Sequence, residues 1–110
     1  MTHDTLQSEA IYSSLATDPD LCELAEMYVD EMPDKIVALE TAFSSGDMEA
    51  LRQKAHQLKG AAGSYGFDQL TPYAAALEAS IRNQQPPDHI CDALNQVITL
   101  CRRVRSGQPQ

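Results

Sequence analysis

Apolar residues recur at helical spacing in five stretches of the chain, and no stretch alternates apolar and polar residues as a half-buried strand would. Start and stop signals predict helices over residues 18–33, 33–45 and 47–62, a fourth from Asp68 or Thr71 through Ile81, and a fifth from Asp88 until Ser106 and Gly107. This pattern indicates an all-α fold.

Several boundaries rest on single residues. Asp18 is expected to cap the first helix with Pro19 at its first position, and Pro33 is expected to end that helix and open the second. Asp47 is expected to cap the third helix, after which residues 63–68, with two glycines, interrupt the pattern. The first helix should bury an apolar stripe made of Leu21, Leu24, Ala25, Tyr28, Val29 and Met32.

The short loops between these helices favour an antiparallel up-down four-helix bundle with an additional N-terminal helix. Residues 1–17 form an N-terminal segment, in which Ile11, Tyr12 and Leu15 suggest a short helix. Residues 18–106 form the bundle, and residues 107–110 are expected to fray. A chain of 110 residues provides one compact domain, which we expect to be a monomer.

Charge and composition exclude several classes of partner. The chain has 16 acidic and 8 basic residues and a formal net charge of −8, which disfavours nucleic acid and anionic membranes. Neither a signal peptide nor a membrane span is apparent, so a soluble cytoplasmic protein is expected. Three cysteines without CxxC spacing read as reduced thiols, and three dispersed histidines give no metal signal.

His56 is the residue whose position suggests chemistry. At 100° per residue it lies about 140° from the centre of the third helix's apolar stripe, so its imidazole should face solvent. The same outward arc contains two cations, an amide and two glycines, namely Arg52, Lys59, Gln53, Gly60 and Gly63. A reactive histidine beside cations and bare backbone is therefore predicted, although a lone exposed histidine is more often only solvated.

Gly60 and Gly63 are unfavourable in a helix, each by about 1 kcal/mol against alanine, and this cost calls for a compensating role. A partner that brings its own reactive group to the imidazole needs the next turn free of side chains, which glycine provides. Lys59 supplies a cation for phosphoryl oxygens.

The segment from Ala55 to Gly66, AHQLKGAAGSYG, resembles the signature of histidine-containing phosphotransfer (HPt) domains, HxLKG followed by small residues and a second glycine turn. The resemblance extends from the Asp-Pro pair at residue 18 to Ile81. It implies that His56 accepts the phosphoryl group, that Lys59 neutralises it, and that Gly60 admits a receiver domain. Arg52 and Gly63 would join the contact surface.

The resemblance also implies that Glu78 hydrogen-bonds the unreactive ring nitrogen of the histidine and that position 82, here Arg82, is basic. By spacing alone, Glu78 and Arg82 form an i, i+4 pair, which is a weak surface contact in most helices.

The function expected from these residues is phosphoryl exchange between His56 and the aspartate of a response-regulator receiver domain or hybrid histidine kinase in two-component signalling. No ATP-binding motif is present, so a carrier without kinase activity is expected, with no cofactor of its own and with Mg²⁺ on the partner receiver. Two alternatives stay open. One is the phosphotransfer domain of a chemotaxis histidine kinase, which residues 64–67 also resemble, and the other is a helical adaptor that binds through the same face without phosphotransfer.

Overall fold

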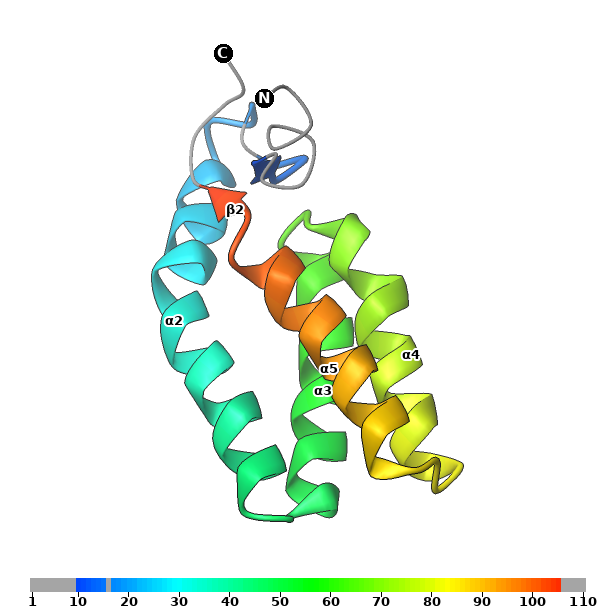
Figure 1. Ribbon diagram of the computed structural model, residues 1–110. Coiled ribbons are helices and arrows are strands. Elements are labelled where there is room, and N and C mark those ends of the chain that lie inside the picture. The colour runs from blue at the N-terminus through cyan, green and yellow to red at the C-terminus, as the bar shows by residue number, and fades with distance from the viewer. Residues whose placement is uncertain (1–9, 16, 106–110) are drawn as a thin grey trace, which may run out of the picture.

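The computed structural model describes residues 10–15 and 17–105 and is all-helical apart from two very short strands (Figure 1). In chain order the elements are β1 (Ile11–Tyr12), α2 (Cys22–Ser44), α3 (Met48–Ser64), the 3₁₀ helix η1 (Asp68–Leu70), α4 (Thr71–Arg82), α5 (Pro87–Cys101) and β2 (Val104–Arg105). The predicted all-α class is confirmed. Within the described residues, no helix combines the length and the apolar character that crossing a membrane requires.

The prediction that Pro33 separates two helices is wrong, because α2 runs through it without interruption. Proline inside a helix removes one hydrogen bond and costs about 3 kcal/mol. Here the ring lies on the exposed side, while Met32, Ile36 and Leu39 continue one buried stripe across it. Burial of that stripe outweighs the lost hydrogen bond, and residues 22–44 form a single long helix.

The start of α2 also differs from the prediction. The Asp18 carboxylate accepts a hydrogen bond from the Asp20 backbone N–H at 2.8 Å, which forms a local turn, and the helix begins only at Cys22. Leu21 and Leu24, predicted to point inward, are 36% and 40% exposed. The buried stripe therefore begins at Ala25.

Helix α3 begins as predicted, since the Asp47 side chain accepts a hydrogen bond from the Ala50 N–H at 3.0 Å. It extends two residues into the predicted interruption, 63–68, and ends at Ser64 with Tyr65 as its C-terminal cap. The chain then turns at Gly66, whose φ of +83° is the left-handed conformation that glycine adopts without strain. Each of the two predicted starts of the fourth helix is the start of an element, because η1 begins at Asp68 and α4 begins at Thr71.

Both ends of the described chain are strands where helix was predicted. Ile11 and Tyr12 pair in parallel with Val104 and Arg105, so the predicted N-terminal helix through Ile11 is wrong and the last helix ends at Cys101 rather than near residue 106. Ile11 and Val104 are 3% and 4% exposed. Burial of these two β-branched side chains in one pair explains why the extended conformation prevails. The predicted frayed tail, 107–110, lies outside the described residues.

In the described part of the chain, two hydrogen bonds join Ser13 and Ser14 to the turn that follows α3. The Ser13 hydroxyl donates to the Tyr65 carbonyl at 2.6 Å, and the Ser14 N–H donates to the Gly66 carbonyl at 2.9 Å. A Cβ on Gly66 would clash with the Ser13 Oγ and would lie 2.9 Å from the Ser14 backbone nitrogen. Only glycine permits this close approach.

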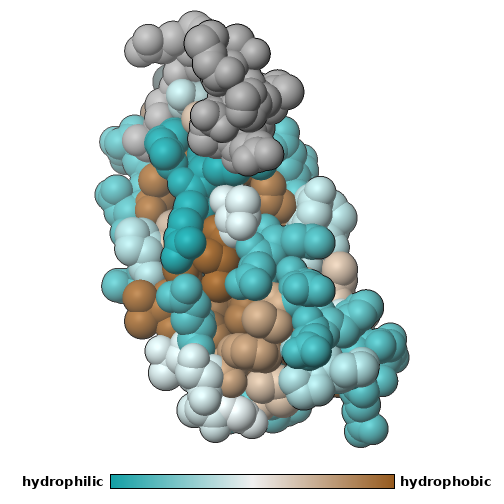
Figure 2. Space-filling view, in the orientation of Figure 1, coloured by the Kyte–Doolittle hydropathy of each residue, from teal (hydrophilic) through white to brown (hydrophobic). Residues whose placement is uncertain are grey.

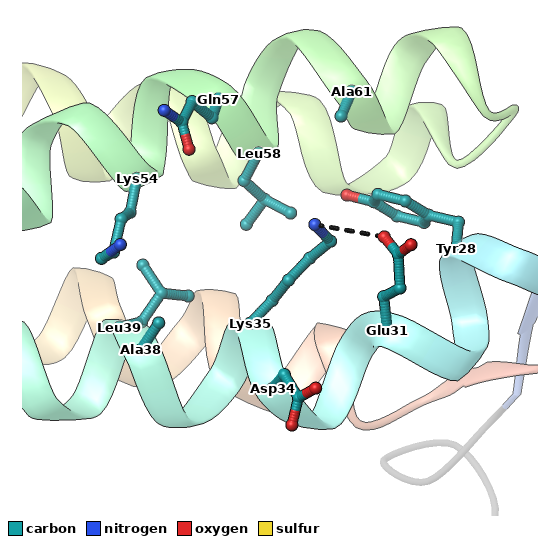
Figure 3. A pocket seen from close by; sticks show the side chains of 10 residues that line it. All are labelled: Tyr28, Glu31, Asp34, Lys35, Ala38, Leu39, Lys54, Gln57, Leu58 and Ala61. Atoms are coloured by element: carbon teal, nitrogen blue, oxygen red, sulfur yellow. Dashed lines mark ion pairs between the residues drawn. The ribbon is translucent and has the colours of Figure 1, made fainter.

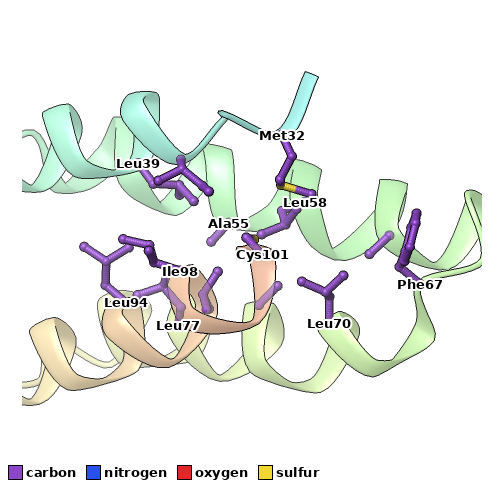
Figure 4. Close-up of a cluster of buried hydrophobic side chains, with 14 of the residues drawn as sticks. Met32, Leu39, Ala55, Leu58, Phe67, Leu70, Leu77, Leu94, Ile98 and Cys101 are labelled. Atoms are coloured by element: carbon purple, nitrogen blue, oxygen red, sulfur yellow. The ribbon is translucent and has the colours of Figure 1, made fainter. Parts of the chain in front are cut away.

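The four helices lie side by side and enclose one apolar core (Figures 1 and 4). The most extensive packing between helices is that of α3 with α4, followed by that of α4 with α5. The core includes side chains from all four helices and from the turn after α3, among them Met32, Leu39, Leu58, Phe67, Leu77, Leu94 and Ile98. Apolar residues also reach the surface between α2 and α5 (Figure 2), where Val29, Pro33 and Val37 line a shallow groove. The packing fixes which side chains of α3 and α4 face each other.

Candidate functional site

His56 stands on the outer surface of α3, one turn before Gly60. Its side chain is 63% exposed, although Ala55 and Leu58 beside it are buried. The predicted outward orientation of the imidazole is therefore observed. An exposed ring on a rigid helix is accessible to a partner, while its backbone is held in place by the core beneath it.

The imidazole of His56 is hydrogen-bonded to Glu78 of α4. The Nδ1 atom of His56 lies 2.9 Å from Oε2 of Glu78, and Nζ of Lys59 donates to Oε1 of the same carboxylate at 2.8 Å. The Glu78 side chain is only 4% exposed. One buried carboxylate thus holds both the histidine and the lysine of the HxLKG motif.

The charge state of Glu78 follows from these contacts. The hydrogen bond from Lys59 holds the pKa of this carboxyl below its ordinary value, and the hydrogen bond with His56 lowers it further, against the opposing effect of burial. Glu78 is therefore ionised at neutral pH and can only accept hydrogen bonds. Consequently Nδ1 of His56 carries a proton, and in the neutral ring Nε2 has the free lone pair.

Arg52 approaches the same carboxylate from the preceding turn of α3. One of its terminal nitrogens, Nη1, is 3.9 Å from Oε2 of Glu78. Its Nε and Nη2 donate to the two carboxylate oxygens of Glu49 at 3.1 and 2.6 Å. This bidentate pair raises the pKa of Arg52 and lowers that of Glu49, chiefly through the hydrogen bonds between them.

The two glycines leave the surface open beyond the histidine. A Cβ built on Gly60 would meet nothing within 4 Å, and one on Gly63 would lie 3.9 Å from the nearest atoms, in Asp68 and Thr71. Neither glycine is therefore required by packing within the described chain. This agrees with the predicted clearance, although contact with a partner stays a prediction.

Arg82 is a predicted site residue that, among the described residues, makes no ion pair with Glu78. It is exposed at the end of α4, and in the described part of the chain Glu78 pairs across to α3 rather than along α4 with Arg82. The i, i+4 pair suggested by spacing is thus not formed. The physical reason is the burial of Glu78, which turns its carboxylate toward the cations of α3.

Sequence reasoning missed Glu49 and the burial of Glu78. Glu49 lies three residues before Arg52, a spacing at which opposite charges meet on a helix, so that signal was present. The burial of Glu78 had a weaker signal. Leu77 and Ile81 mark the inward stripe of this helix, but they do not show whether Glu78, at the edge of that stripe, is buried as well.

A separate cavity of about 390 Å³ lies between α2 and α3 (Figure 3), and neither His56 nor Glu78 lines it. Lys54 enters it at one end and the Tyr28 ring at the other, with Leu39 and Leu58 between them. The Tyr28 hydroxyl is buried and has no hydrogen-bond partner among the described residues, and burial raises the pKa of this phenol well above its ordinary value. Lys35 lies over the ring, 5.4 Å from its centre.

Comparison with known proteins gives one match. The family model described as Hpt domain matches residues 23–107, which span α2 to α5 and include His56, Lys59 and Glu78. No curated protein and no solved structure matches the chain. Because the family model covers most of the sequence, the chain belongs to the Hpt domain family.

Proposed function

We propose that the chain accepts a phosphoryl group on Nε2 of His56 and exchanges it with the aspartate of a receiver domain. Membership of the Hpt domain family implies histidine phosphotransfer in a phosphorelay. The single observation that carries the residue assignment is the 2.9 Å contact between Nδ1 of the exposed His56 and the buried, ionised Glu78. The antiparallel up-down order of a four-helix bundle and a monomeric state are part of the same proposal.

The contact with Glu78 selects the nucleophile. With its proton on Nδ1, the ring attacks phosphorus through the Nε2 lone pair as the bond from phosphorus to the aspartate oxygen breaks and the carboxylate leaves. The product ring has a proton on Nδ1 and phosphorus on Nε2, so it is cationic. The Glu78 carboxylate stabilises that cation, and the same arrangement serves the reverse transfer.

Lys59 supports the reaction from the next turn. One of its N–H groups is bound to Glu78, and the side chain is 32% exposed, which leaves donors for phosphoryl oxygens. Arg52 and the open surface at Gly60 and Gly63 complete the proposed contact area. Any Mg²⁺ needed for charge stabilisation is expected on the receiver domain. This chain has only to position His56 and to supply cations for the phosphoryl oxygens.

This role is that of a phosphoryl carrier rather than a kinase. The donor or acceptor is expected to be a response-regulator receiver domain or a hybrid histidine kinase. In the adaptor alternative, the same face would bind a partner with His56 unmodified.

The test is phosphotransfer from purified phosphorylated receiver domains of the source organism to the full chain. We expect acid-labile label on the wild type and on His89→Gln, in which the other described histidine, also exposed, is changed, and none on His56→Gln. Incubation with labelled ATP alone should give no label. Binding of receivers without label at His56 would support the adaptor instead.

A further inference from the structure

Arg82 lines a groove that extends from the His56 site toward the N-terminal end of α3. The groove has a volume of about 750 Å³ and lies where the turn between α2 and α3 meets the loop between α4 and α5. We call it the arginine groove, and its main lining residues are Phe43, Met48, Arg52, Ile81, Arg82 and Gln85.

The groove is basic in an otherwise acidic protein. Its lining includes two basic residues, Arg52 and Arg82, and one acidic residue, Glu49, which pairs with Arg52, so Arg82 supplies the uncompensated positive charge, whereas the whole chain has 16 acidic residues against 8 basic ones. Arg82 is exposed and takes part in no ion pair among the described residues. The floor is apolar, with Phe43 and Met48 only partly buried. Such a surface favours carboxylates beside apolar side chains.

Arg52 joins this groove to the phosphotransfer site. Its Nη1 lies 3.9 Å from the Glu78 oxygen that contacts His56, and its side chain also lines the groove. Arg82 follows Glu78 by one turn of α4, just as Arg52 precedes His56 by one turn of α3. A partner seated at His56 is therefore within reach of both arginines.

We propose that the arginine groove binds an acidic, partly apolar segment of the receiver domain while the aspartate of that receiver is aligned with His56. This inference rests on the proposed function and deepens it, because it assigns to Arg82 and the groove a role in partner selection. The groove acts on binding, whereas the His56, Glu78 and Lys59 cluster acts on the transfer step.

The cavity between α2 and α3 does not share this character. Its lining contains Lys35 and Lys54 but also Glu31 and Asp34, and Lys35 already pairs with Glu31 at 3.6 Å. Its charges balance, so it offers no comparable preference for an acidic partner.

The test measures transfer rates between the full chain and a phosphorylated receiver at increasing receiver concentration. Arg82→Ala should raise KM about two- to fivefold, the range of one exposed ion pair, with kcat unchanged. Arg82→Glu and Gln85→Glu, which place an anion in the groove, should also raise KM. Gln85→Lys should lower it. These differences in KM should shrink in 1 M salt, where the Debye length is about 3 Å and charges are strongly screened.

Arg102→Ala is the matched control, because Arg102 is also an exposed arginine but lines the groove between α2 and α5 and pairs with Glu40. It should leave KM unchanged. If transfer through His56 proceeds and all changes at Arg82 and Gln85 leave KM unchanged, the arginine groove is not a docking site and the proposed function stands. If no receiver transfers to His56 at all, the proposed function itself fails.

Discussion

Gly60 offers a substitution for which stability and function should move in opposite directions. It lies in the interior of α3, where glycine costs about 0.5–1 kcal/mol against alanine, and an added Cβ would meet nothing within 4 Å. Gly60→Ala should therefore stabilise the fold by about that amount. No neighbouring group in the described part of the chain has to move to accept the methyl group.

The size of the melting shift follows from the length of the chain. Unfolding entropy near the midpoint is about 2.1 cal/mol/K per residue, or about 0.23 kcal/mol/K for 110 residues. A gain of 0.5–1 kcal/mol then corresponds to a rise in Tm of about 2–4 °C, which thermal denaturation followed by circular dichroism resolves. Gly60→Gln should melt close to the wild type or slightly above it, since glutamine is also a good helix former.

Transfer should respond in the other direction. A glutamine side chain one turn beyond His56 stands where the receiver must approach, and misplacement of the reacting groups by about 1 Å can slow a reaction about a hundredfold. We expect Gly60→Gln to slow phosphotransfer at least about tenfold and Gly60→Ala to slow it less. Rapid-quench transfer assays on the folded variants measure this.

Thr99→Gln provides the control, because it places the same side chain on an exposed position of α5 that lines a different groove. It should leave transfer unchanged. The reasoning is refuted if Gly60→Gln lowers Tm while transfer per folded molecule stays at the wild-type rate, because Gly60 would then be a packing glycine. It is equally refuted if both Tm and transfer stay unchanged.

Three further predictions concern the site and its support. Because the pKa of Glu78 is lowered in the folded chain, ionised Glu78 stabilises the fold above the ordinary carboxyl pKa of 4.5, and this stabilisation is lost as pH falls through the lowered pKa. The Tm of Glu78→Gln should therefore fall less steeply in acid than the Tm of the wild type, and the variant should also transfer the phosphoryl group more slowly. Lys59→Ala should slow transfer or shorten the lifetime of the phosphohistidine and let the Glu78 pKa rise, measurable by carbon-detected NMR titration; unchanged values would make Lys59 a bystander. Gly66→Ala should destabilise the fold by about 1–3 kcal/mol in urea denaturation, more than Gly46→Ala, which shares the positive φ but has open space around it.

Local sequence patterns are sufficient to predict the helical class and the face of α3 on which His56 lies. Periodic apolar residues place a side chain inside or outside a helix through geometry that needs no partner, and the Asp47 cap is likewise a contact within four residues. The open surface at Gly60 could be predicted for the same reason. The HxLKG spacing then identified the family, which the match over residues 23–107 bears out.

Features that depend on contacts between distant segments follow from the assembled fold and not from local patterns. By local rules Pro33 should end a helix, yet α2 continues through it because the apolar stripe on either side of it is buried. At the two ends of the described chain, the parallel pairing of Ile11 with Val104 gives strands where helices were predicted. By spacing Glu78 could pair with Arg82, but burial of its carboxylate against α3 directs it to Lys59 and to His56, the contact that the family resemblance had implied. Hydrophobic burial and cross-helix hydrogen bonds are properties of the assembled fold, so local patterns do not encode their outcome.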